Sequence, residues 1–102
     1  MSLTKRYLKS KPMCKVTFKV PKMVAEGAQS VHLVGEFNDW DENHTAMNRR
    51  KSGDFDITID LETGRAYEFR YLVDGEVWQN EPNADGYVAT HIPEVRNSVV
   101  AV

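Results

Sequence analysis

The sequence predicts an all-β fold, an immunoglobulin-like sandwich of two sheets with about seven strands. Three observations lead to this prediction. Apolar and polar residues alternate with period two in several short segments, turn signals separate these segments, and no window has the apolar periodicity of an amphipathic helix. A chain of 102 residues is long enough for one core and too short for a cleft between two domains.

The strands can be assigned in order along the chain. Alternation predicts a half-buried strand at 14–20, and the short apolar run at 31–34 predicts a more deeply buried one. Alternation returns at 55–61 and at 67–73, with turn residues between the two segments. The Asp74-Gly75 pair then predicts a tight hairpin leading into a short strand, and the chain ends in an apolar strand.

The strand at 67–73 also predicts the direction of one charged side chain. If Tyr67, Phe69 and Tyr71 face the core, Arg70 must point outward from the opposite face. An outward cation on a strand has two interpretations, a ligand contact or a solubilising residue.

Composition and charge set limits on the function. A hydrophobic content of 41% and a charged content of 27% are ordinary for a soluble globular protein, and the net charge of −2 argues against binding a polyanion. We expect the basic segment 1–13 to be a flexible tail, and not a nucleic-acid-binding arm, before a domain at 14–102.

The lack of a recognisable targeting signal and the single cysteine predict a cytoplasmic location. No apolar run follows the basic start, so we expect neither a signal peptide nor a membrane contact. The single cysteine, Cys14, allows no internal disulfide, which agrees with a reducing cytoplasm, and we expect it to pack as a small apolar residue.

Two tryptophans follow turn signals, and they are the first candidates for a binding site. Trp40 stands among Asn and Asp residues after the strand at 31–34, and Trp78 follows the Asp74-Gly75 turn. A large aromatic side chain at such a place either caps the core or offers a flat face to a ligand. Sugar rings are the usual ligands of paired, exposed aromatic rings.

Several ordered motifs resemble carbohydrate-binding module family 48, the early-set immunoglobulin-like domain of isoamylases and glycogen branching enzymes. The chain is also similar to the glycogen-binding domain in the beta subunit of AMP-activated protein kinase. The resemblance covers roughly residues 14–102 and rests on these motifs: Val31-His32-Leu33-Val34-Gly35-Glu36-Phe37-Asn38-Asp39-Trp40, Tyr67-Glu68-Phe69-Arg70-Tyr71-Leu72-Val73-Asp74-Gly75, Trp78, and Asn97-Ser98-Val99-Val100.

The resemblance implies four sugar contacts. Trp40 and Trp78 correspond to the stacking aromatics, and Asn97 to an amide that bonds sugar hydroxyls. Arg70 stands where the kinase-type domains carry a lysine, so the charge is kept and the shape is changed. Pro93 falls near a position where those domains use a leucine to contact the glucan.

One register question concerns Trp78. Compared with the kinase-type pattern, one additional residue, Val77, lies between the Asp-Gly turn and the tryptophan. Because side chains alternate between faces, one insertion moves Trp78 to the opposite face unless a bulge absorbs it. Trp78 therefore faces either the ligand or the core.

We expect no catalytic activity, cofactor or metal. Asp39, Asp41 and Glu42 fit a solvated turn better than a glycosidase pair, which flanks a deep cleft on separate elements. The histidines lack metal-ligand spacing, and the glycines show no phosphate-binding pattern.

The sequence therefore predicts a non-catalytic module that binds α-1,4-linked glucans such as glycogen, starch and maltodextrins, either polysaccharide or oligosaccharide. It can act by bringing a glycogen-metabolising enzyme to the polymer in trans. The alternative is a protein-interaction or regulatory early-set domain that has lost sugar binding, whose exposed edge strands also allow a homodimer.

Overall fold

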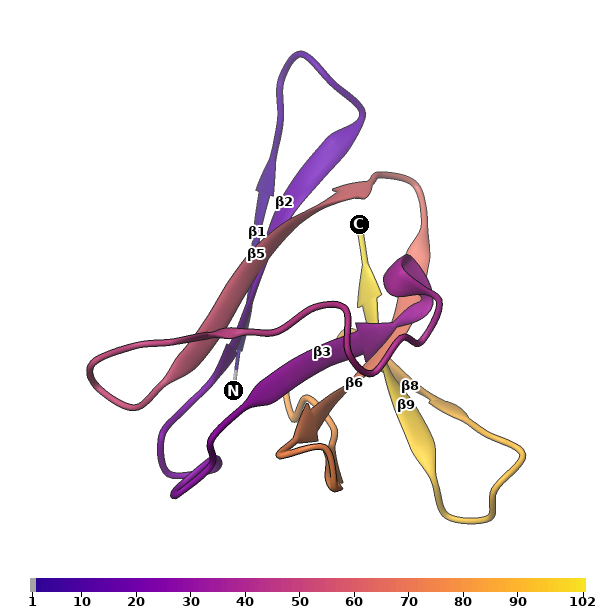
Figure 1. The fold of residues 1–102 in the computed structure, drawn as a ribbon. Coiled ribbons are helices and arrows are strands. Elements are labelled where there is room, and N and C mark those ends of the chain that lie inside the picture. The colour runs from indigo at the N-terminus through magenta and orange to yellow at the C-terminus, as the bar shows by residue number, and fades with distance from the viewer. Residues whose placement is uncertain (1) are drawn as a thin grey trace.

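Two antiparallel sheets face each other in the computed structural model, which describes residues 2–102 (Figure 1). The first sheet has the strand order β1-β2-β5-β4. Its strands are β1 (Ser2–Tyr7), β2 (Met13–Val20), β5 (Phe55–Glu62) and β4 (Asn48–Arg49).

The second sheet is centred on strand β6 and has the order β3-β6-β9-β8. Strand β9 pairs with the first half of β6, and β7 pairs with its second half. The strands are β3 (Val31–Gly35), β6 (Ala66–Val73), β9 (Arg96–Ala101), β8 (Gly86–Ala89) and β7 (Val77–Gln79).

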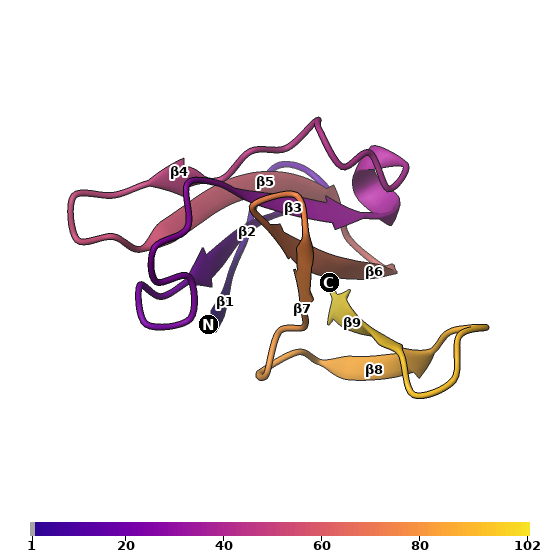
Figure 2. The same ribbon diagram turned by 60° about the horizontal axis from the view of Figure 1, so that its bottom comes forward.

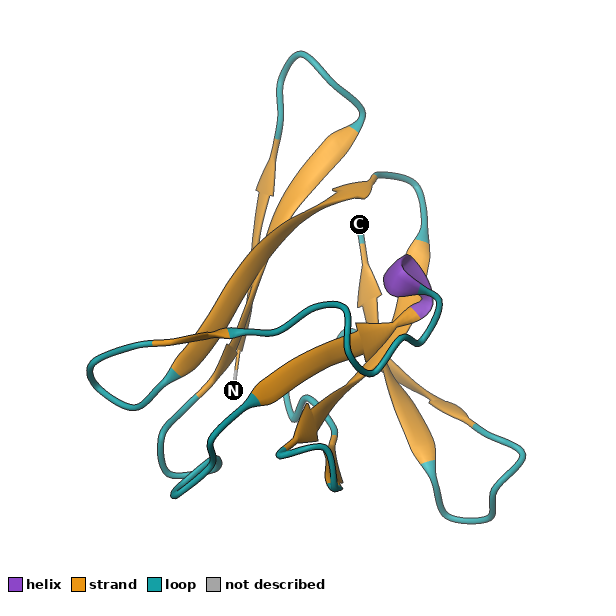
Figure 3. Ribbon diagram, viewed as in Figure 1, coloured by secondary structure: helices purple, strands orange, loops and turns teal. Residues whose placement is uncertain are grey.

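Helix is nearly absent from the described chain (Figure 3). Over residues 2–102 the helical structure consists of one 3₁₀ turn, η1 (Glu36–Asn38), directly after β3. Within the same residues, no helix is long and apolar enough to cross a membrane. In Figures 1 and 2, η1 and the loop that joins β8 to β9 both lie toward the right of the view.

The predicted all-β sandwich is confirmed, and each strand predicted from the sequence is present. Strands β1, β4 and β8 are additional. Strand β1 lies within the segment for which the sequence predicts a basic tail, and residue 1 lies outside the described part. Lys5 and Tyr7 share the inward face of β1 with Leu3, so the segment lacks a regular apolar alternation. Lys5 instead forms an ion pair with Asp85, at 2.6 Å.

The core lies between the sheets and combines aromatic rings with aliphatic side chains. Phe18 of β2 meets Phe69 of β6 edge-on, with ring centroids 5.1 Å apart, and Phe69 meets Tyr71 in the same way at 5.7 Å. Such edge-on contacts add to the stabilisation that comes from burial alone. Cys14 is fully buried in this cluster, as the sequence predicts.

A buried carboxylate fixes the segment that follows β7. Glu81 is fully buried and accepts hydrogen bonds from the Tyr71 hydroxyl at 2.8 Å and from the backbone N–H of Asn83 at 3.0 Å. Its own N–H donates to the Ser98 hydroxyl at 2.8 Å. Burial, and then the neighbouring Glu81 carboxylate, raise the pKa of Tyr71 far above its ordinary value, so this phenol remains a donor. The network joins the end of β7 to β6 and β9.

The close approach of β3 to β6 depends on Gly35. A Cβ atom at this position would lie 2.6 Å from the Glu68 carbonyl oxygen, 2.8 Å from the Phe69 Cβ and 3.0 Å from the Phe37 ring. Two of these neighbours belong to the central strand and cannot move freely. Only glycine therefore fits where β3 ends and η1 begins.

We predict that Gly35→Ala destabilises the fold by about 1–3 kcal/mol, the usual cost of overpacking a core. Urea unfolding followed by tryptophan fluorescence measures this change. Gly86→Ala is the matched control, because no heavy atom lies within 4 Å of a Cβ placed there. Equal unfolding midpoints for the two variants would contradict this account.

Candidate functional site

The outward face of β6 carries the polar side chains that the strand does not use for the core. Tyr67, Phe69 and Tyr71 are buried, whereas Glu68 and Arg70 are partly exposed on the opposite face. The predicted outward direction of Arg70 is thus what the pleat produces. Burial of part of its side chain lowers the pKa of Arg70, but arginine remains charged throughout the physiological range.

Trp78 lies on this same outward face. In the pairing of β6 with β7, Trp78 is directly opposite Leu72, and cross-strand partners point to the same side of a sheet. The turn takes up residues 74–76, with Asp74 and Gly75 both at positive φ, and so absorbs the additional residue. Trp78 is 36% exposed, and the Arg70 guanidinium lies over its ring at 4.5 Å from the centroid.

Trp40 is held by a tightly bonded loop. Phe37 anchors η1 to the core, with its ring centroid 5.9 Å from that of Phe18. The Asn38 side chain accepts from the Gly35 N–H at 3.0 Å and donates to the Leu33 carbonyl at 2.8 Å and the Thr45 hydroxyl at 2.9 Å. The motif therefore fixes the base of the loop.

The same bonds stabilise an unfavourable backbone next to the ring. Asp39 and Trp40 both have left-handed conformations, with φ of 56° and 57°. This conformation costs an L-residue roughly 1–2 kcal/mol. The Trp40 N–H donates to the Gly35 carbonyl at 2.9 Å, which closes the loop, and the indole is left 36% exposed.

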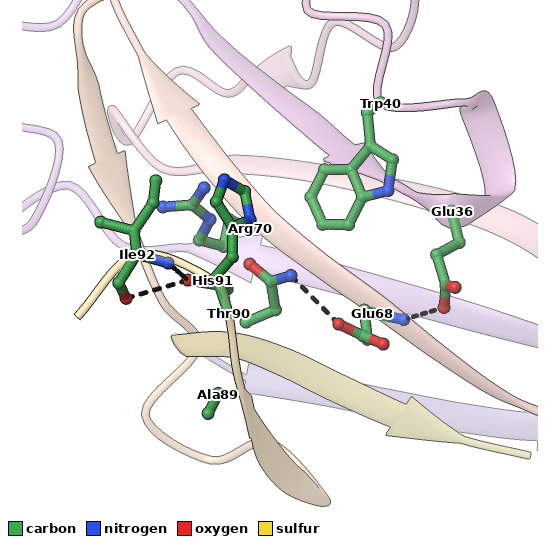
Figure 4. A pocket seen from close by; sticks show the side chains of 9 residues that line it. Glu36, Trp40, Glu68, Arg70, Ala89, Thr90, His91 and Ile92 are labelled. Carbon is green, nitrogen blue, oxygen red and sulfur yellow. Dashed lines mark hydrogen bonds between the residues drawn. The ribbon is translucent and has the colours of Figure 1, made fainter. Parts of the chain in front are cut away.

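An open hollow of about 440 Å³ lies in front of these side chains (Figure 4). Three of the four predicted site residues line it: Trp40, Arg70 and Asn97. The fourth, Trp78, is outside the lining, and its ring contacts the Arg70 guanidinium. The remaining lining residues are Glu36, Glu68, Ala89, Thr90, His91 and Ile92.

The hollow has chemically distinct sides. In Figure 4 the Trp40 indole overhangs the space between Arg70, His91 and Ile92 on one side and the carboxylates of Glu36 and Glu68 on the other. Ile92 is 47% exposed, and its backbone N–H is bonded to the Thr90 hydroxyl at 3.1 Å. Pro93 is not among the lining residues, whereas its neighbour Ile92 is.

The two carboxylates are bonded to their surroundings. Glu36 accepts from the backbone N–H of Glu68 at 2.7 Å, a donor left free because β3 ends at Gly35. Glu68 accepts from the Asn97 side-chain amide at 3.1 Å. Within residues 2–102, the side-chain oxygen of Asn97 (Oδ1) and the Nε of Arg70 are buried and have no hydrogen-bond partner.

Sequence reasoning missed the acidic side of the hollow and the loop at 89–92. Glu68 could have been found, because it is two residues from Arg70 on the strand and must share its face. Glu36 and the loop are brought near by the sheet topology, for which the sequence carries no local signal. No group of three or more His, Cys, Asp or Glu side chains in the described chain is arranged to hold a metal ion.

An immunoglobulin-like sandwich with an exposed tryptophan above a polar hollow has the features of a carbohydrate-binding module. The chain belongs to the family described as the glycogen recognition site of AMP-activated protein kinase, whose model matches residues 20–99. The resemblance seen in the sequence motifs is confirmed.

One curated relative gives a second, shorter match. The 1,4-alpha-glucan branching enzyme GlgB of Mesorhizobium japonicum is 40% identical over 50 residues. The matched segment is 47% of this chain and 7% of that enzyme. The similarity therefore concerns a small part of the relative.

We predict that Asn38→Asp destabilises the protein by about 1–3 kcal/mol, because the Leu33 carbonyl loses its donor and faces a carboxylate instead. The free energy of unfolding in urea tests this. Asn43→Asp makes the same chemical change at an exposed position of the same loop and serves as the control. The account fails if both variants unfold at the same urea concentration.

Proposed function

We propose that this module binds α-1,4-linked glucans such as glycogen, starch and maltodextrins, on the outward face of the sheet centred on β6. The observation that carries the proposal is the exposed Trp40 indole beside a hollow lined by Arg70 and Asn97. Membership of a glycogen-recognition family supports it.

Glucose has two kinds of surface, and the hollow offers a partner for each. The C–H face of a pyranose packs on a flat aromatic ring, which Trp40 supplies. The hydroxyl groups each donate and accept hydrogen bonds. Arg70 can only donate, while the unpartnered side-chain oxygen of Asn97 can only accept.

Trp78 contributes in two ways under this proposal. Its ring holds the Arg70 guanidinium by a cation–π contact, which fixes the direction of the donors. The exposed remainder of the indole extends the stacking surface along the glucan chain. A polymer ligand can then contact both tryptophans, with Arg70 between them.

The proposed role is binding without catalysis. The hollow is open, and the carboxylates of Glu36 and Glu68 accept hydrogen bonds from the protein itself. An open site with few contacts binds weakly, and we expect dissociation constants of about 1 μM to 1 mM per site. A polymer with many sites compensates through avidity.

The partner predictions follow from this role. A glucan-bound module can bring a glycogen-metabolising enzyme to the polymer. A cytoplasmic location and the formation of a homodimer remain predictions from the sequence. The alternative, a docking domain for proteins, would use the edge strand β8, where Tyr87 and Val88 are 37% and 41% exposed.

We predict that Trp40→Ala abolishes retardation of the protein in native gels containing glycogen or amylopectin, because the ring is the principal stacking surface. Tyr7→Ala is the matched control, since this 55% exposed aromatic lies on β1 of the other sheet. Free migration of the native protein, without heat of binding to maltoheptaose, would contradict the proposal and favour protein docking.

We predict that Trp78→Ala weakens maltoheptaose binding about tenfold, a loss of roughly 1.4 kcal/mol from the Arg70 contact and the stacking surface. Isothermal titration calorimetry measures it. Val77→Ala is the control, because Val77 is adjacent and its side chain points to the other face of β7. Equal affinity for the two variants would remove Trp78 from the proposed site.

A further inference from the structure

Glu68 is hydrogen-bonded to two other residues of the hollow, Glu36 and Asn97. It is not one of the four residues for which the sequence resemblance implies a sugar contact. Its backbone N–H is held by the Glu36 carboxylate at 2.7 Å, and its own carboxylate accepts from the Asn97 amide at 3.1 Å. Glu68 pairs with Val99 across β6 and β9, so Asn97 is its diagonal neighbour on the same face. The two side chains are thus placed together by strand register.

This contact decides which end of the Asn97 side chain faces the ligand. An ionised carboxylate can only accept hydrogen bonds, so the amide nitrogen of Asn97 must turn toward Glu68. The carbonyl oxygen then points away from Glu68. Asn97 is only 9% exposed, and within residues 2–102 this oxygen has no partner.

A buried acceptor without a donor is costly, and a ligand hydroxyl can supply the missing hydrogen. Without Glu68, the Asn97 amide could rotate and present its nitrogen to the hollow. The hollow would then offer donors from both Arg70 and Asn97, and it would lose the acceptor that complements Arg70.

We propose that Glu68 is a positioning residue that orients the Asn97 carboxamide so that its oxygen accepts a hydrogen bond from a glucan hydroxyl. This inference rests on the proposed function, because it requires a glucan in the hollow. Glu68 itself acts through Asn97, and Glu36 holds the strand backbone at the same point.

A double-mutant cycle tests the proposal, with maltoheptaose affinity measured by calorimetry for Glu68→Ala, Asn97→Ala and the double variant. We expect each single variant to bind about tenfold more weakly than the native protein, and the double variant to bind no more weakly than Asn97→Ala. Glu68→Gln should stay within about threefold of native, because its amide oxygen can still accept from Asn97.

Three controls distinguish a positioning role from a loss of folding and from a change in net charge. Thermal unfolding establishes that each variant is folded. If Glu68→Ala does not fold, Glu68→Gln still tests the hydrogen bond from Asn97. Glu76→Ala removes one negative charge at an exposed turn and should bind like the native protein.

Native-like binding by Glu68→Ala, or additive losses in the double variant, would overturn the positioning role while Trp40→Ala still abolished binding. If the native protein itself fails to bind maltoheptaose, the proposed function fails, and the inference fails with it.

Discussion

The pleat of strand β6 is the constraint on which both the core and the candidate site depend. Side chains at successive positions point to opposite faces, so Tyr67, Phe69 and Tyr71 build the core while Glu68 and Arg70 stand on the outward face. A shift of one residue in register would bury the charges and expose the rings. The packing energy of the aromatic core therefore also holds the polar face in place.

The loop that carries Trp40 is fixed to β3, to β6 and to the core. Gly35 allows β3 to approach β6, Phe37 packs against the core, and Asn38 bonds the loop to β3. These contacts stabilise two left-handed residues and leave the indole exposed. Under the proposed function, the ring is held in place before a glucan binds, and a preorganised site loses less entropy on binding. That matters for an open hollow with few contacts.

Much of the fold could be predicted from the sequence, because alternation in β2, β5 and β6 is a local signal. Strand β1 was not predicted, because the inward-facing Lys5 interrupts the apolar alternation of this strand. At the site, the outward direction of Arg70 followed from the pleat. The face of Trp78 did not, because it depends on how many residues the turn absorbs. The contact of Glu68 with Asn97 joins two residues that are 29 positions apart, so no local pattern reveals it.

A titration of the ¹⁵N-labelled protein with maltoheptaose, followed by NMR, tests the central claim most directly. We predict that the indole N–H signals of Trp40 and Trp78 shift, together with backbone amides of β6, β9 and residues 89–92, while the sheet of β1, β2, β5 and β4 stays unchanged. Shifts confined to the edges of β1 or β8, or none at all, would contradict a glucan site on the outward face of β6.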